Sequence, residues 1–115
     1  MNLRKIFLIA VLGLSGLANA DIVTVINAVE TATSNVSVPT APNGRLMFRP
    51  CDSKCDEKFI AVRLTPQTKY AVNGQAVNFL DFRKEFFNQR GKGDGYALVS
   101  YETETSTATS VRISY

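Results

Sequence analysis

The chain has 115 residues with 13 Lys and Arg, 10 Asp and Glu, and no His or Trp. This length fits one domain, and the lack of His excludes Ser-His-Asp and Cys-His catalytic sites and His-ligated metal centres. The net charge of +3 overstates the basic character, because Arg4 and Lys5 are the only charged residues among the first 20. Without that segment the charge is +1, which argues against nucleic acid or an anionic membrane as a partner.

The first 20 residues have the pattern of a secretory signal peptide. Two basic residues precede an apolar run from Ile6 to Leu17, and Ala18-Asn19-Ala20 supplies the small residues that signal peptidase requires. The run is shorter than the roughly 20 apolar residues that span a bilayer. We therefore expect cleavage between Ala20 and Asp21, no membrane anchor afterwards, and a periplasmic or secreted protein. The organisation is a signal peptide, 1–20, followed by one domain, 21–115.

The first part of the mature sequence predicts short strands. Asp21–Glu30 is dense in β-branched residues with apolar side chains on both faces, which predicts a buried or central strand. Thr31–Gly44 is rich in Ser, Thr, Asn, Pro and Gly and predicts a long loop, with a short strand around Asn35–Val38. Arg45–Pro50 and Lys58–Leu64 alternate apolar and polar residues, so we expect them to form a hairpin.

Two cysteines lie in the turn of this hairpin, in the pattern C-x3-C. In an oxidising compartment Cys51 and Cys55 are expected to form a disulfide. The alternative is a soft-metal site, in which both thiolates bind Cu(I) or Zn(II) with help from Asp52 and Asp56. A redox-active thiol pair is a third interpretation, but no helix N-terminus is predicted at Cys51 to lower the pKa of its thiol.

The second half begins with a hairpin and a helix. Asn73-Gly74 lies between Lys69–Val72 and Gln75–Val77 and is a strong signal for a β-hairpin with a two-residue loop. Phe79–Arg90 has phenylalanines at i, i+3 and i+7, which predicts an amphipathic helix with its aromatic stripe in the core. Asn78 is a suitable N-cap for this helix.

The last two strands are expected at Tyr96–Glu102 and Ala108–Tyr115, joined by the polar loop Thr103–Thr107. About six short strands and one helix in the mature chain predict a mainly β, small single-domain barrel. We expect an OB-like or SH3-like barrel in which the helix covers an open end.

The stretch from Lys58 to Ile113 resembles small secreted bacterial β-barrel domains of the OB-like or SH3-like type. The resemblance rests on Leu64–Tyr70, Val72-Asn73-Gly74, Phe79–Phe87, Gly93-Asp94, Tyr96–Tyr101 and Val111-Arg112-Ile113. The cysteine pair and the full helix depart from this layout. The resemblance implies a fold and a compartment, and it carries over no catalytic residue.

These patterns predict an exported binding or structural module of the bacterial cell envelope, without a cofactor and not an enzyme. Its partner would be a protein or another envelope component. Tyr70, Tyr96 and Tyr101 together with Arg63 are the predicted binding face. Such aromatics also serve OB-type single-strand binding, but export and the near-neutral charge argue against nucleic acid.

Two other functions use different residues. A periplasmic protein that handles copper or zinc would use Cys51 and Cys55. A hydrolase with paired carboxylates would need two acids in one cleft, whereas most acids here fall in predicted turns or on the exposed helix face. Loops Thr31–Gly44 and Thr103–Thr107 are further candidate binding segments for the leading hypothesis.

Overall fold

The structure is a computed structural model that describes residues 24–50 and 58–115. The predicted signal peptide, with its cleavage point between Ala20 and Asp21, lies outside the described residues. The predicted turn with Cys51 and Cys55, including Asp52 and Asp56, lies outside them as well.

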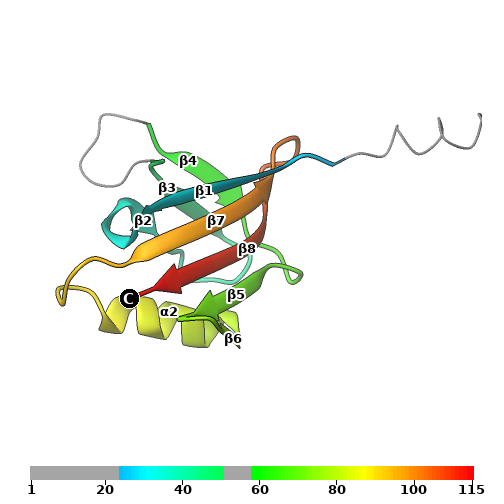
Figure 1. Ribbon diagram of the computed structural model, residues 1–115. Coiled ribbons are helices and arrows are strands. Elements are labelled where there is room, and N and C mark those ends of the chain that lie inside the picture. The colour runs from blue at the N-terminus through cyan, green and yellow to red at the C-terminus, as the bar shows by residue number, and fades with distance from the viewer. Residues whose placement is uncertain (1–23, 51–57) are drawn as a thin grey trace, which may run out of the picture.

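Within the described residues eight strands join in one sheet, and the mainly β fold predicted from the sequence is confirmed (Figure 1). The strands follow the order β1-β7-β8-β4-β3-β2, while β5 pairs with β8 and β6 pairs with β5. The total is eight where about six were expected. It includes β2 and β6, of two and three residues, which lie at the short strand expected around Asn35–Val38 and at Gln75–Val77 of the predicted hairpin. The elements in chain order are β1 (Ile26–Ala32), η1 (Thr33–Asn35), β2 (Val36–Ser37), β3 (Arg45–Phe48), β4 (Ile60–Arg63), β5 (Lys69–Val72), β6 (Gln75–Val77), α2 (Phe79–Asn88), β7 (Tyr96–Glu102) and β8 (Thr107–Ser114).

Strand β8 makes the sheet curl, because it has different neighbours along one of its edges. It pairs with β7 over its length, but on the other side it meets β4 at Thr107 and β5 from Ser110 to Ile113. A bulge between β7 and β8 at Ser100 and Tyr101 adds local twist. The Thr31 hydroxyl at the end of β1 donates to the Arg49 carbonyl, 2.6 Å away, so the far end of the sheet returns towards β1. The result is a curled, barrel-like sheet with β3 and β4 behind β1 and β7 (Figure 1).

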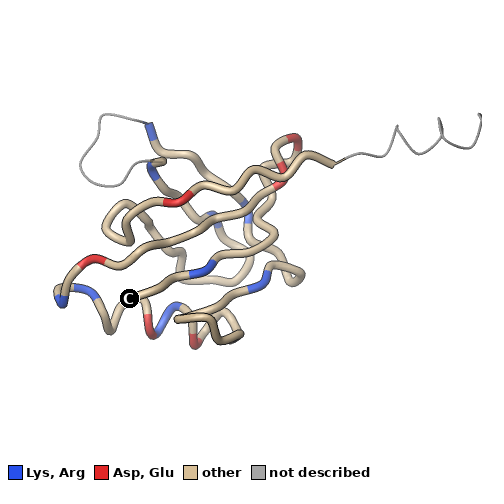
Figure 2. The backbone as a smooth tube through the Cα atoms, in the orientation of Figure 1, with Lys and Arg blue, Asp and Glu red and all other residues tan. Residues whose placement is uncertain are grey.

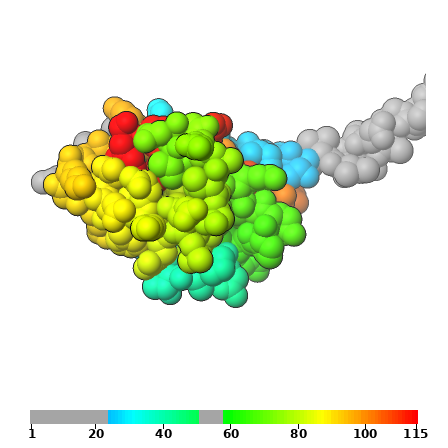
Figure 3. Space-filling view, turned by 90° about the horizontal axis from the view of Figure 1, so that it is seen from below, coloured from blue at the N-terminus to red at the C-terminus, as the bar shows by residue number. Residues whose placement is uncertain are grey.

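Helix α2 covers one end of this curled sheet (Figure 3). Its N-terminus is capped as predicted, since the Asn78 side chain accepts a hydrogen bond from the Asp81 amide at 2.8 Å. Phe79, Phe82 and Phe86 are buried, which confirms the aromatic stripe as core. The Tyr70 ring of β5 lies 5.1 Å from the Phe82 ring, so the helix is held by aromatic packing.

Strand β1 differs from its prediction as a buried or central strand. Within the described part of the chain it lies at one end of the strand order and pairs with β7 alone. Val25 is 57% exposed and Ile26 is 48% exposed. Val25 lies just before the strand, and Ile26 lies on its outer face. Ile26 contacts solvent because nothing in the described structure packs over that face. Apolar side chains on both faces of a strand therefore did not mean burial here.

The core is the interior of the curled sheet. It is filled by the inward-facing side chains of the strands, and the outward-facing side chains do not contribute to it. Its fully buried members come from β3, β4, β7, β8 and α2 and include Leu46, Phe48, Val62, Phe82, Ala97, Val99, Val111 and Ile113. These side chains alternate with exposed ones along each strand, as a half-buried sheet requires. The outer side chains of the same strands are therefore the surface available for function.

Candidate functional site

The four residues of the predicted binding face do not lie on one surface. Tyr70 is 7% exposed beneath α2, and Tyr101 is 9% exposed with its ring 6.0 Å from Phe48. Tyr96 is 59% exposed on the outer side of β7, and Arg63 is exposed on β4. Both buried tyrosines have inward positions in the alternation of their strands, so the structure places them in the core. Burial accordingly raises the pKa of the Tyr70 hydroxyl.

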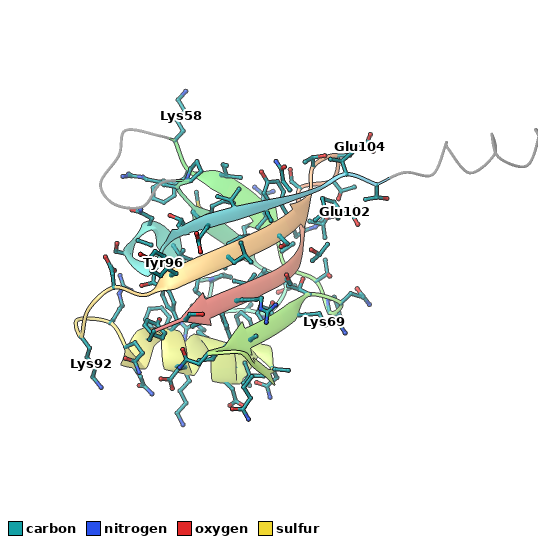
Figure 4. All side chains as sticks on the ribbon, in the orientation of Figure 1. Lys58, Lys69, Lys92, Tyr96, Glu102 and Glu104 are labelled. Carbon is teal, nitrogen blue, oxygen red and sulfur yellow. The ribbon has the colours of Figure 1, made fainter. Side chains whose placement is uncertain are left out.

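The first outer surface is the solvent-facing side of β1, β7 and β8, which is turned towards the viewer in Figure 1. The register aligns Glu30, Leu98 and Arg112 in one row across these strands. Tyr96 lies two residues before Leu98 on the same outer side of β7, and Figure 4 labels it at the start of this strand. A shallow depression of about 230 Å³ lies here, lined by Glu30, Gly74, Tyr96, Ala97, Leu98, Arg112 and Ser114. We call this surface the β7 face; it is apolar at its centre, with one acid and one base at its sides.

The edge of β1 presents backbone groups that β7 does not use. The Val25 carbonyl accepts from the Thr103 amide at 3.1 Å, and the Thr33 amide donates to the Gly95 carbonyl at 2.9 Å. Hydrogen-bonded pairs alternate along an antiparallel ladder. The amides and carbonyls of Ile26, Ala28 and Glu30 therefore point away from β7. No strand of the described chain pairs with them, and we call these three residues the β1 edge.

The second outer surface belongs to β3 and β4, and we call it the β3–β4 face. Arg45 lies directly opposite Arg63, and Met47 lies opposite Ala61. Met47 is 39% exposed, and the charge of this face comes from arginine. Farther along, the Arg49 guanidinium stacks over the ring of Phe59 at 4.4 Å. Along the described backbone, Lys and Arg are otherwise spread over several strands, loops and the helix (Figure 2).

A cavity of about 370 Å³ lies between η1 and the end of α2 and includes Phe86, Arg90 and Tyr115 in its wall. The Asp94 carboxylate in the wall of this cavity is already hydrogen-bonded within the protein. It accepts from the Ser34 hydroxyl at 3.0 Å and from the Thr33 hydroxyl at 3.5 Å. The Thr33 hydroxyl also accepts from the Gly95 amide at 2.9 Å. These bonds tie η1 to the loop before β7. We interpret the cluster as a structural connection.

The pKa of the Tyr115 hydroxyl in this cavity is raised, first by burial and then by the negative charges of Glu85 and Asp94. A phenol with a raised pKa remains protonated at neutral pH and is a poor general base. The cavity therefore offers no activated group through this tyrosine.

Residues 24–50 and 58–115 contain neither a clustered metal-binding group nor a helix suited to span a membrane. This part of the chain holds no group of three or more His, Cys, Asp and Glu side chains arranged to bind a metal ion. None of its helices combines the length and apolar character that a membrane span requires. Cys51 and Cys55, on which the metal alternative depends, lie outside these residues.

No protein-family model, curated protein or solved structure matches this chain. A functional proposal for this protein therefore rests on its own surfaces. Two of these surfaces were missed from the sequence, the β1 edge and the opposed arginines. Alternation along Arg45–Phe48 does place Arg45 and Met47 on one outer face, but the partner opposite each residue depends on the register of the hairpin.

Proposed function

We propose that the protein is an exported, non-enzymatic binding module of the bacterial cell envelope that binds an extended segment of a protein partner along the β1 edge. The signal-peptide pattern and the resemblance to small secreted barrel domains support the compartment. The observation that carries the proposal is the edge itself, with the backbone groups of Ile26, Ala28 and Glu30 directed away from the sheet.

This edge lacks the features that usually prevent strands from pairing with other chains. Natural edge strands are shortened, bulged, or protected by Lys or Pro. Strand β1 has seven residues, no Pro, no Lys and one charged side chain, Glu30. Its register with β7 is regular over seven pairs, from Ile26 to Ala32. An extended peptide can therefore add to it as a further strand through main-chain hydrogen bonds.

The side chains along the edge define what a partner strand should carry. On the outer face, Ile26 offers an apolar contact and Glu30 a carboxylate, with the small Ala28 between them. Directly opposed cross-strand pairs are favourable between apolar residues and between opposite charges. The fitting segment has an apolar residue beside Ile26 and a basic residue beside Glu30.

Two variants at one position test the proposal. In Ala28→Pro the outward amide is lost while the hydrogen bonds to β7 remain, because Pro is tolerated where a strand's N–H faces solvent. Ala28→Ser keeps the amide and is the matched control. For a protein captured from an envelope extract, we expect Ala28→Pro to weaken binding about 5- to 10-fold, corresponding to one lost hydrogen bond of about 1–1.5 kcal/mol. Ala28→Ser should bind like the wild type.

Amide hydrogen exchange gives the direct readout, since bound partner should protect Ile26, Ala28 and Glu30. Equal affinity of the proline and serine variants for the captured protein would contradict strand addition, as would an extract that yields no reproducible partner. A concentration-dependent dimer that Ala28→Pro abolishes would instead identify a second copy of the chain as the occupant of the edge.

A further inference from the structure

Two arginines face each other across β3 and β4 without an opposite charge between them. Arg45 and Arg63 form a directly opposed pair in the antiparallel register, and both are exposed. Directly opposed residues have Cβ atoms about 4.5–5.5 Å apart, and like charges at this spacing destabilise a sheet. Within the described chain neither side chain has an ion pair or hydrogen bond. The arrangement costs stability unless something else neutralises the pair.

A depression of about 240 Å³ lies at this arginine pair. Its wall is made by Arg45, Ala61, Arg63, Thr105 and Ser106. The small Ala61 side chain leaves room between the strands, and the turn between β7 and β8 supplies two hydroxyl-bearing residues. The site therefore combines two guanidinium groups with hydroxyl groups around one space.

The turn that forms the far wall is held to β4 by the backbone. The Arg63 amide donates to the Ser106 carbonyl at 2.8 Å, and Thr107 bridges to Arg63 at the start of β8. Ser106 has a φ of 53°, a left-handed conformation that directs the chain back towards β4. The arginines and hydroxyls therefore belong to one connected frame.

Two acidic residues lie close to this turn, Glu102 at the end of β7 and Glu104 within the turn, and neither lines the depression. The Glu102 carboxylate accepts a hydrogen bond from the Thr105 hydroxyl at 3.1 Å. Glu104 is exposed on the hairpin between β7 and β8 (Figure 4). Their charges lower the positive potential near the arginine pair but leave both guanidinium groups open to a ligand.

We propose that Arg45 and Arg63 bind a phosphate group, carried by a small phosphorylated molecule or by a phospholipid headgroup. The planar guanidinium donates two parallel hydrogen bonds to phosphate oxygens. A phosphate dianion matches the two positive charges and removes their repulsion. This inference goes beyond the proposed function, because it requires neither the β1 edge nor a protein partner.

Inorganic phosphate is the first probe, compared with sodium chloride at equal ionic strength. A ligand that binds only the folded state raises the melting temperature. We expect phosphate to raise it for the wild-type protein, and Arg45→Gln or Arg63→Gln to weaken the phosphate Kd at least about 10-fold, the size of losing a charge-assisted hydrogen bond. Arg112→Gln is the matched control, since it removes one exposed arginine from the β7 face.

Two conservative variants guard against loss of the fold. Arg45→Lys and Arg63→Lys keep the charge but lose the planar fork, so they should bind phosphate more weakly than wild type and more tightly than the glutamine variants. Without phosphate, the glutamine variants should melt at or above the wild-type temperature, because the repulsion is gone. An equal loss of phosphate binding in Arg112→Gln, or no phosphate effect on the wild type, would overturn the proposal.

The source of the phosphate is distinguished with vesicles. If the protein sediments with phosphatidic acid vesicles, is released by inorganic phosphate and ignores phosphatidylcholine, the ligand is a lipid headgroup. If it binds free phosphate and neither vesicle, the ligand is a soluble phosphorylated molecule. If the double variant with Arg45→Gln and Arg63→Gln still binds the vesicles, other residues are responsible for membrane binding. That result would overturn the proposed phosphate site.

Discussion

The β1 edge and the β3–β4 face lie on the same curled sheet, yet they offer different chemistry. The edge presents the backbone of Ile26, Ala28 and Glu30 beside largely apolar side chains. The β3–β4 face presents two guanidinium groups opposite each other. Backbone hydrogen bonds recognise an extended chain with little regard to its charge, whereas guanidinium groups recognise oxyanions. The difference shows that one small sheet can present two chemically distinct surfaces, one made of backbone groups and one made of guanidinium groups.

The largest expected effect is a difference in the free energy of unfolding between proline substitutions on the two sides of β1. Val29 neighbours Ala28, but its amide faces β7 and pairs with Val99. Val29→Pro should therefore lower the free energy of unfolding by about 1–3 kcal/mol, since a buried carbonyl loses its partner. Ala28→Pro should change it by less than about 0.5 kcal/mol, as at other surface positions. Urea denaturation of both variants measures the contrast, and equal destabilisation would mean that β1 has no free edge.

The next effect concerns Cys51 and Cys55, which lie in the sequence between β3 and β4, outside the described residues. If Cys51 and Cys55 form the predicted disulfide, replacing both with Ser should cost about 2 kcal/mol of stability in the chain-entropy model. The intact mass of the exported protein should be about two hydrogens below the reduced mass. We expect phosphate affinity to fall modestly and binding at the β1 edge to stay unchanged. A reduced mass with bound copper or zinc would favour the metal-handling alternative instead.

The smallest effect is the response to salt. Charge interactions at an exposed site are screened as the Debye length shortens from about 10 Å at 0.1 M to about 3 Å at 1 M salt. Phosphate binding to Arg45 and Arg63 should weaken several-fold over this range, while binding of a protein segment at the β1 edge should change little. Titrations at both salt concentrations measure the difference. If binding of the protein segment at the β1 edge depended strongly on salt, its affinity would come mainly from the charge of Glu30 and not from backbone hydrogen bonds.

Much of the fold could be predicted locally. The Asn73-Gly74 turn has positive φ angles of 50° and 84°, which the hairpin requires. The phenylalanine stripe of α2 and its Asn78 cap were both predicted, because each depends on residues within a turn or two of helix. The helix ends at Asn88, two residues before the predicted Arg90.

The candidate sites depended on partners far away in the sequence. Whether β1 is central or an edge is decided by what pairs on its second side, and its one described partner, β7, lies about seventy residues later. Tyr70 and Tyr101 looked like a binding face, but the curl of the sheet and the position of α2 bury them. Arg45 meets Arg63 only through the hairpin register.

The sequence by itself therefore determined the local elements: the strands, the turns, the amphipathic helix and its cap, together with the predicted export signal. These follow from backbone preferences and from the spacing of apolar side chains. Only the tertiary structure decided which outer positions lie opposite each other and which backbone groups have no strand beside them. The physical reason is that alternation places a side chain on a face, whereas pairing register and sheet curvature decide what that face meets.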